Sequence, residues 1–433
     1  MARVLEKLDK LLLLVGLVVL SGALTPLLAG TYDYHEERDG LLLRIIWTTI
    51  YAFALSLLML RRGWPVHAAK ATPAVLGVVA ICLASSLWSP APLVTLSRVV
   101  NLVGTTLLGV YLGMRFSMRE LTGYLYVVAT ILVGLSLAVC LAGLPFSRFP
   151  GWEEKVIWQG VFGHKNGLGL ISSLSLLTLL MRGLRRERVG LAALVLAGIA
   201  CFTLYKSSSF TPALSLLLAA GVGGALFVST RLGLTRAAAA SVIALVVGGC
   251  AAIALGAKDA LLVAADKSAD GSGRGDIWQV ALQLVGEHPA LGVGYGTLGD
   301  TAGFKQLSEL HHHVIAHCHN GYLELAASVG LPASLLGAYA LADFMRLGLR
   351  GTRAGVDLAA LVFATYVAAY NMFEIGLYSQ QRLLYVFFLA LYVQLRWRAA
   401  AVGASAQRGA MRVSSVLPLR GSAVGSLRRA QLP

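Results

Sequence analysis

Long apolar runs separated by short polar segments dominate the chain. A membrane-spanning helix needs about 20 mostly apolar residues, and twelve runs reach or approach that length. The pattern therefore predicts an all-α, polytopic integral membrane protein with about 12 transmembrane helices. The runs lie near residues 11–30, 41–60, 72–88, 93–113, 121–144, 167–181, 189–205, 210–228, 237–256, 321–344, 356–374 and 383–397.

The polar segments divide the chain into four parts. Residues 1–256 form a predicted N-terminal membrane bundle of about nine spans, and 321–397 a C-terminal bundle of about three. Between them, 257–320 is a large loop on the outer side of the membrane. Residues 398–433 are rich in Ser, Gly, Ala and Arg without periodicity, so a disordered basic cytoplasmic tail is predicted there.

The formal net charge of +15 would suggest a nucleic-acid partner in a soluble protein. Only 13% of the residues are charged, however, and the excess follows the loops. With the N-terminus in the cytoplasm, cytoplasmic segments hold 24 of the 36 Lys and Arg residues and outer segments hold ten. Because cytoplasmic loops are enriched in Lys and Arg, the charge indicates orientation, both termini are predicted to be cytoplasmic, and no nucleic-acid partner is expected.

Four ionisable residues lie inside the predicted spans, where charges are costly and tend to mark function. Arg44, Arg98, Glu324 and Glu374 each fall within about two turns of the outer end of their span. Snorkelling toward outer headgroups would explain each one separately. Their shared side indicates a polar cavity that opens outward.

Three spans begin at the outer face with a distinctive polar segment. His164, Lys165 and Asn166 precede the sixth span, Lys206 and three serines precede the eighth, and His319-Asn320 precedes the tenth. Cations oppose the dipole of a helix N-terminus unless an anion binds among them. An anion site is therefore predicted, with contact of the lysines to lipid headgroups as the alternative.

The outer loop contributes an arginine to the same side of the membrane. Arg274 lies in a Gly-rich stretch, and its planar guanidinium suits phosphate; a solvated loop arginine is the alternative. Asp276 is the predicted N-cap of the amphipathic helix that follows. The apolar positions at helical spacing are Ile277, Ala281, Leu284 and Val285.

Five histidines crowd into residues 311–319. His313 and His317 have the i, i+4 spacing of zinc ligands, but no carboxylate completes a set and no HExxH occurs, so no metal is predicted. His319 at the start of a span is the preferred general base. A Cys318–His319 dyad is disfavoured because sequence neighbours on a helix diverge by about 100°, and no GxSxG motif supports a serine hydrolase.

These segments together resemble a known family. His319-Asn320-Gly321-Tyr322-Leu323 followed by Gly330 resembles the H-N-x-x-L…G signature of the O-antigen ligase/polymerase superfamily of bacterial membrane proteins. Arg274 to Trp278 with the segment 288–294 is similar to its R-x(3)-W…hPllGvG block, and 163–166 to its F-G-H-K-N block. Many members carry an S-R pattern after the seventh span, where this chain has Lys206 before three serines.

The resemblance implies an O-antigen ligase of the Gram-negative inner membrane with a periplasmic active site. Such an enzyme moves O-antigen polysaccharide from undecaprenyl diphosphate to a sugar hydroxyl of lipid A–core, without metal or other cofactor. Its partners are these two glycolipids and the surrounding membrane lipids. His319 and Arg274 are the predicted catalytic residues. The predicted substrate-binding residues are Lys165, His164, Asn166, Lys206, Asn320 and Arg98.

The predicted reaction is a single displacement that inverts the anomeric carbon. His319 takes the proton of the acceptor hydroxyl, while Arg274 and the lysines stabilise the departing diphosphate. An O-antigen polymerase or a protein O-oligosaccharyltransferase of the same superfamily remains an alternative. A transporter or flippase of lipid-linked sugars is a second one, against which the one-sided distribution of intramembrane charges argues.

Overall fold

The computed structural model describes residues 2–23, 41–61, 64–150, 156–233, 274–312, 314–351 and 357–416, which are mostly helical. A short antiparallel hairpin pairs β1 (Arg148–Pro150) with β2 (Val156–Trp158), with Arg148 opposite Trp158. The α-helices are α1 (Ala2–Leu20), α3 (Leu41–Met59), α4 (Trp64–Ala71), α5 (Pro73–Ala84), α6 (Pro92–Arg115), α7 (Met118–Leu141), α8 (Lys165–Leu184), α9 (Leu191–Lys206), α10 (Phe210–Arg231), α13 (Arg274–Glu287), α14 (Ala302–Leu310), α15 (Gly321–Gly351), α16 (Leu358–Asn371) and α17 (Leu383–Val416).

The helices agree with the predicted spans. Every span predicted from the apolar runs overlaps a helix, apart from 237–256, which lies outside the described residues. Within the described part of the chain, seven helices are long and apolar enough to cross a membrane, and three apolar helices are shorter. The protein is thus a helical, polytopic membrane protein, and the total of twelve spans stays a prediction.

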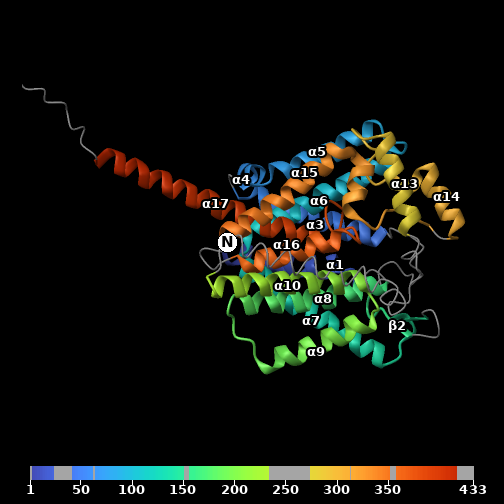
Figure 1. Cartoon of the computed structure of the whole chain (residues 1–433), viewed down its shortest axis with the longest axis horizontal. Coiled ribbons are helices and arrows are strands. Elements are labelled where there is room, and N and C mark those ends of the chain that lie inside the picture. Colours follow the sequence, from blue (N-terminus) through green and yellow to red (C-terminus); the bar gives the residue numbers. More distant parts are fainter. Residues whose placement is uncertain are drawn as a thin grey trace, which may run out of the picture.

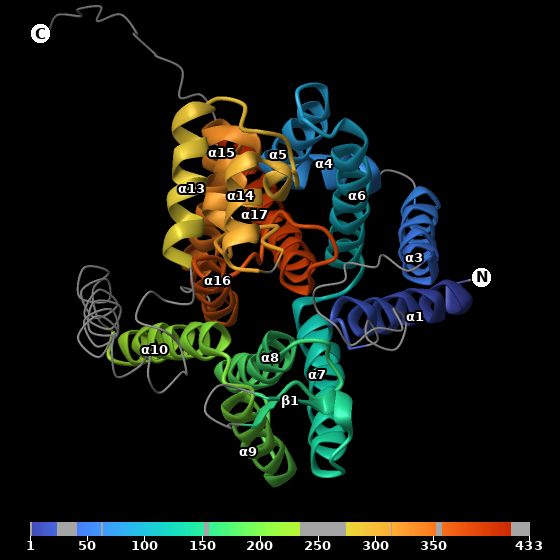
Figure 2. The ribbon, with the colours of Figure 1, turned by 90° about the vertical axis from the view of Figure 1, so that its right-hand side faces the viewer.

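The long helices lie side by side and form an elongated bundle (Figure 1). Helices α13 and α14 and the hairpin lie at one end, and the second half of α17 projects from the other. We call these the outer end and the inner end, after the orientation predicted from the loop charges. Seen from the outer end, α7, α8, α9 and α10 form one group and α5, α6, α15 and α17 form another, with α16 between them (Figure 2).

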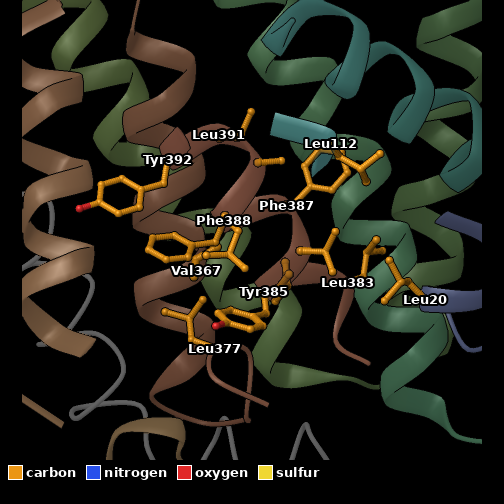
Figure 3. Packing of buried hydrophobic residues seen from close by; sticks show 14 of the residues in the cluster. Leu20, Leu112, Val367, Leu377, Leu383, Tyr385, Phe387, Phe388, Leu391 and Tyr392 are labelled. Atoms are coloured by element: carbon orange, nitrogen blue, oxygen red, sulfur yellow. The ribbon is translucent and has the colours of Figure 1, made fainter. Parts of the chain in front are cut away.

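Helix α17 occupies the centre of the second group. Its residues 383–395 are buried on every side, as expected of a helix that is apolar all round. Phe387 packs against Phe363 of α16 and Phe388 against Phe344 of α15, and Figure 3 shows both in one cluster with Tyr385 and Tyr392 of α17 itself. Gly109 and Gly113 let α6 approach closely, since a Cβ at Gly113 would lie 2.5 Å from the carbonyl oxygen of Ala390. Such small-residue spacing permits close backbone contact between membrane helices.

The structure differs from the prediction for the C-terminal tail. Helix α17 continues to Val416, through residues that were predicted to be disordered. Alanine has the highest helix propensity of all residues, and this segment is rich in it. A helix that already exists also extends without a new nucleation step, so α17 continues through 399–416 without a break. Residues 417–433 lie outside the described part.

Helix α15 is interrupted at Gly330, where φ is 84° and ψ is 168°. Pro332 has no N–H for the Ser328 carbonyl, and the N–H of Gly294 bonds to that carbonyl instead, at 2.8 Å. Two more bonds join the same segments, from Val293 N–H to the Ala327 carbonyl and from Leu331 N–H to the Pro289 carbonyl. The Pro- and Gly-rich turn at 288–296 thus completes the backbone hydrogen bonds of a broken helix.

Candidate active site

The carboxylate of Glu374 joins both groups of helices at the outer end of the bundle. Its Oε1 accepts a hydrogen bond from Nδ2 of Asn166 at 3.0 Å and lies 3.4 Å from Nη2 of Arg274. Its Oε2 lies 3.2 Å from Nδ1 of His319. Asn166 belongs to α8 in the first group, whereas His319 lies two residues before α15 of the second group and Arg274 is the first residue of α13, which packs on α15. We call these four residues the Glu374 cluster.

The turn after α16 fixes the position of Glu374. The Oδ1 atom of Asn371 accepts hydrogen bonds from the backbone N–H of Gly376 and Leu377, both at 3.0 Å. The N–H of Glu374 bonds in turn to the Tyr370 carbonyl at 2.9 Å. A tight loop that makes its own hydrogen bonds holds the carboxylate more firmly than an open one, because the backbone groups are already satisfied.

His319 is held in an unusual backbone conformation immediately before α15. Its φ is 49°, a left-handed value that histidine adopts more readily than most residues. On one side, Nε1–H of Trp278 donates to the Cys318 carbonyl at 2.9 Å. On the other, the Cys318 N–H donates to Oε2 of Glu324 at 2.7 Å. These two bonds fix the backbone that carries the imidazole.

Arg274 is the first residue of α13, and its guanidinium is mostly buried, with 17% of the side chain exposed. Asp276 was predicted as the N-cap of this helix but lies inside its first turn, so that prediction was wrong. A carboxylate in the first turn still favours the helix through its dipole. Helix α13 packs through Ile277 and Ala281 against a small core that includes Phe304 of α14 and Ala327 of α15.

Asn166 is positioned by its neighbours on α8 and α10. The Nδ1 atom of His164 caps α8 by accepting the Asn166 N–H at 3.2 Å. Oγ–H of Ser209 donates to Oδ1 of Asn166 at 3.0 Å, which leaves Nδ2 facing Glu374. Gly169 permits this approach, since a Cβ there would lie 2.5 Å from Cβ of Ser209.

Charge within the cluster keeps Glu374 ionised. Glu374 lies three residues beyond the end of α16, and 13% of its side chain is exposed. Burial alone would raise the pKa of this carboxyl, but the hydrogen bond and charge of His319, together with the Arg274 guanidinium, lower it to about 2. The carboxylate is therefore an acceptor for the His319 ring at neutral pH.

A second histidine contacts the ring of His319. The ring centroids of His317 and His319 lie 4.4 Å apart in an edge-to-face arrangement. Burial, followed by the charge of His319, lowers the pKa of His317 to about 4. His317 is thus neutral at physiological pH, and the ring that packs against His319 carries no charge.

The other predicted site residues lie in different surroundings. Asn320 caps α15, with Oδ1 accepting the N–H groups of Tyr322 and Leu323 at 3.1 Å each. Lys165 is half-buried at the start of α8, next to Asn166. Nζ of Lys206 lies 5.7 Å from the centroid of the Trp158 ring, in a cation–π contact.

Arg98 lies beside the turn that completes α15. Its Cδ would be 2.6 Å from a Cβ built on Gly296, so the glycine leaves room for the arginine. The role of Arg98 as a substrate ligand stays a prediction, as do those of His164, Lys206 and Asn320.

Metal and thiol chemistry find little support within the described residues. No group of three or more His, Cys, Asp or Glu side chains there is arranged to hold a metal ion, and His313 lies outside that part of the chain. Cys318 is fully buried. Burial, with the charge of Glu324 and a hydrogen bond to it, raises the pKa of its thiol, which disfavours a reactive thiolate.

Glu374 was the site residue that the sequence motifs did not assign. It was recognised as one of four charges near the outer ends of spans, but its partners could not be read from the chain. It lies 55 residues from His319 and 208 from Asn166 in sequence. The available signal was a lone carboxylate in an apolar run, on the same side of the membrane as His319 and Arg274.

Comparison with known proteins agrees with the motifs. Residues 170–338 match the family model described as O-antigen ligase, which confirms the resemblance predicted from the sequence. The matched segment contains Arg274 and His319, while Asn166 and Glu374 lie on either side of it. The match supports a glycosyl-transfer enzyme of the ligase or polymerase type. A search among curated proteins gave no match to this chain.

Proposed function

We propose that this chain, through its O-antigen ligase segment and the Glu374 cluster, transfers a glycan from undecaprenyl diphosphate to a sugar hydroxyl of lipid A–core at the periplasmic face of the inner membrane. The observation that carries the proposal is the contact of one ionised carboxylate with both the His319 ring and the Arg274 guanidinium. A base and a phosphate-binding cation are the two groups that such a transfer requires.

Glu374 is proposed to set the tautomer of His319. An ionised carboxylate 3.2 Å from Nδ1 accepts the proton on that nitrogen, so Nε2 keeps a lone pair for the acceptor hydroxyl. The hydroxyl oxygen attacks the anomeric carbon as its proton passes to Nε2. The bond from that carbon to the diphosphate oxygen breaks, and the electron pair leaves with the diphosphate. Glu374 then stabilises the imidazolium, as the buried carboxylate does in the serine protease triad.

Arg274 is proposed to stabilise the diphosphate as its charge develops. A guanidinium has five N–H donors, and the contact with Glu374 occupies one amino group, Nη2. Lys165 on the adjacent start of α8 is the second proposed cation. Because Glu374 contacts both Arg274 and His319, it would hold the leaving-group site and the base at a fixed separation, and positioning of this kind accounts for much of enzymatic rate acceleration.

The contact of Lys206 with Trp158 favours a packing role for this lysine. Our proposal for diphosphate binding therefore rests on Arg274 and Lys165. Direct displacement predicts inversion at the anomeric carbon. An O-antigen polymerase would use the same cluster with a different acceptor, so the acceptor has to be identified by experiment.

The decisive experiment compares His319→Asn with the wild-type enzyme, purified with both lipid substrates. Asparagine tolerates the left-handed backbone at this position and can still donate to Glu374, but it offers no basic nitrogen. We expect a fall in kcat of at least about 100-fold, within the range for general base catalysis, with thermal stability unchanged.

The matched control is His67→Asn in α4, an exposed histidine outside the cluster, which should keep wild-type turnover. Wild-type turnover by His319→Asn would refute the assignment of the base. Product analysis with lipid A–core or with a second lipid-linked repeat unit as acceptor separates a ligase from a polymerase.

A further inference from the structure

An arginine-rich cavity lies at the inner end of the bundle, remote from the Glu374 cluster. It has a volume of about 670 Å³ and is lined by Arg119, Arg182, Arg185, Arg186, Glu187 and Arg188. Arg119 belongs to the first turn of α7, and the other residues form the end of α8 and the turn that follows it. We call it the arginine pocket.

The depth of the pocket matches the headgroup region of a membrane. Helix α8 begins beside the Glu374 cluster and is 20 residues long, and its last turn lines the pocket. At 1.5 Å per residue this is about 30 Å, the thickness of the hydrocarbon core of a bilayer. A pocket at one end of such a helix faces the interface opposite the proposed active site.

Positive charge in the pocket exceeds negative charge by five residues to one. Glu187 contacts Nε of Arg182 at 2.9 Å and Nε of Arg119 at 3.5 Å. Asp357, the residue before α16, and Arg398 of α17 lie close enough to influence Arg185 and form a pair with each other at 3.6 Å. They therefore add no net charge to the site.

Other arginines at the inner end are balanced more closely. Asp9 is fully buried and binds Arg61 and Arg115, while Asp343 is almost fully buried and binds Arg346 and Arg396. At both of these sites one buried aspartate binds two arginines. A general preference for cytoplasmic arginine accounts for all of these positions, but it does not account for five around a single glutamate.

One guanidinium is held in the pocket with an unused donor. Nη1 of Arg185 donates to Oγ1 of Thr122 at 2.8 Å. Its Nη2 is buried and has no hydrogen-bond partner in the described part of the chain. A buried polar atom of a charged group that lacks a partner is costly. Nη2 of Arg185 therefore indicates a missing acceptor, and Oε1 of Glu187, also buried without a hydrogen-bond partner among the described residues, a missing donor.

Two of the pocket arginines occupy backbone positions where arginine is energetically unfavourable. Helix α8 ends in a Schellman turn, with Glu187 N–H bonded to the Arg182 carbonyl and Arg186 N–H to the Gly183 carbonyl. Arg186 is the left-handed residue of this turn, with φ 57°, where glycine is usual. Arg119 in the first turn of α7 opposes the dipole of that helix. An anion in the pocket would compensate both.

We propose that the arginine pocket binds a phosphate-bearing anion, with the headgroup of an anionic phospholipid in the adjacent leaflet as its source. Arginine binds phosphate through planar, paired hydrogen bonds, and basic pockets between membrane helices are known to hold such headgroups. Nη2 of Arg185 supplies the buried donor, and the exposed Arg186 and Arg188 supply contacts from the solvent side.

The test measures lipid binding to the full-length protein after its bound lipid has been removed in detergent. Vesicles of phosphatidylglycerol and of phosphatidylcholine are the two lipid probes. Arg185→Gln removes the buried donor, and Arg188→Gln removes a donor from an exposed side chain. Arg231→Gln at the end of α10 is the matched control, because it removes one exposed charge from the same end of the bundle.

We expect the wild type and Arg231→Gln to bind phosphatidylglycerol in preference to phosphatidylcholine. Each pocket variant should bind it at least about tenfold more weakly, as expected for a lost charge-assisted hydrogen bond. Equal binding of phosphatidylglycerol by the pocket variants and the wild type would overturn the proposal. It would also be overturned if the wild type bound both lipids equally and did not bind inorganic phosphate.

Inorganic phosphate, measured by calorimetry, is the second arm of the test. Phosphate binding that depends on Arg185, with no preference between the lipids, would assign the pocket to a free anion. A preference for phosphatidylglycerol without phosphate binding would assign it to the headgroup. All these readouts are binding measurements, so they stand or fall independently of glycan transfer.

Discussion

Replacement of Glu374 by glutamine would isolate the charge of the cluster while keeping its shape. In the native protein three donors converge on the two carboxylate oxygens, at 3.0 Å from Asn166, 3.4 Å from Arg274 and 3.2 Å from His319. A glutamine has one oxygen and one amino group. One side of the cluster must therefore face the amino group, whichever way the amide turns.

Each orientation of the glutamine amide has a definite cost. If the amide oxygen faces Asn166 and Arg274, the amino group faces Nδ1 of His319 and favours the tautomer that carries its proton on Nε2, which cannot act as a base. If the amide is reversed, its amino group opposes the donors of Asn166 and Arg274. A hydrogen bond to a charged group contributes about 1.5–3 kcal/mol, so we expect kcat to fall roughly 10- to 150-fold.

The assay is steady-state transfer by the purified enzyme with the lipid-linked donor and the acceptor varied in turn. A loss confined to kcat, with the KM of the acceptor unchanged, would indicate an interaction made in the transition state. Glu309→Gln in α14 is the control, because Glu309 is an exposed glutamate at the same end of the bundle. If Glu374→Gln retained kcat within about twofold of the wild type while remaining folded, the proposed role of the carboxylate would be refuted.

Three further predictions concern other parts of the structure. Gly330→Ala should lower the free energy of unfolding by at least about 1–3 kcal/mol, because φ is 84° and the new Cβ would lie 2.2 Å from the Ala290 carbonyl oxygen. Thermal denaturation in detergent measures this change, and an unchanged melting temperature would contradict the prediction. Lys206→Gln should leave the KM of the donor within about twofold, because the ammonium contacts Trp158; a tenfold rise would instead make it a diphosphate ligand. Since the pKa of Glu374 is lowered from 4.5 to about 2, its contribution to stability is complete above about pH 4.5 and is lost as the pH falls toward 2. The difference in melting temperature between the wild type and Glu374→Gln should therefore shrink over that interval, and a difference that grew on acidification would show the opposite sign of coupling.

Most of the fold could be predicted because a bilayer imposes length and polarity on every span. Helix starts at Lys165, Phe210 and Gly321 follow the predicted polar segments closely. The sequence was a poorer guide outside the membrane, where no such constraint applies, as at the tail that was predicted to be disordered but extends α17 to Val416. Asp276 was misplaced as a cap because the helix begins two residues earlier, at Arg274, and helix boundaries depend on local packing that composition does not specify.

The site was predictable in its parts but not in its connections. His319, Arg274 and Asn166 were all selected as functional residues, since polar groups at helix starts are conspicuous in an apolar chain. The sequence could not show that Glu374 contacts all three, because that depends on how α16 packs between the two groups of helices. Nor could it separate His164 and Asn320, which cap helices, from residues that face the cluster.

The hydrogen bonds between the turn at 288–296 and the broken helix α15 bear on how the protein opens. The N–H groups of Val293 and Gly294 bond to carbonyls of α15, and the N–H of Leu331 in α15 bonds to a carbonyl of the turn. Separation of the two segments would therefore expose N–H groups of both. Local opening units often coincide with segments joined in this way. In a hydrogen–deuterium exchange experiment these amides should therefore exchange together and slowly, although the turn lies outside the helices. The outer segment and the membrane helix would then unfold as one cooperative unit. Arg274 and His319 would therefore keep their relative positions until α15 unfolds.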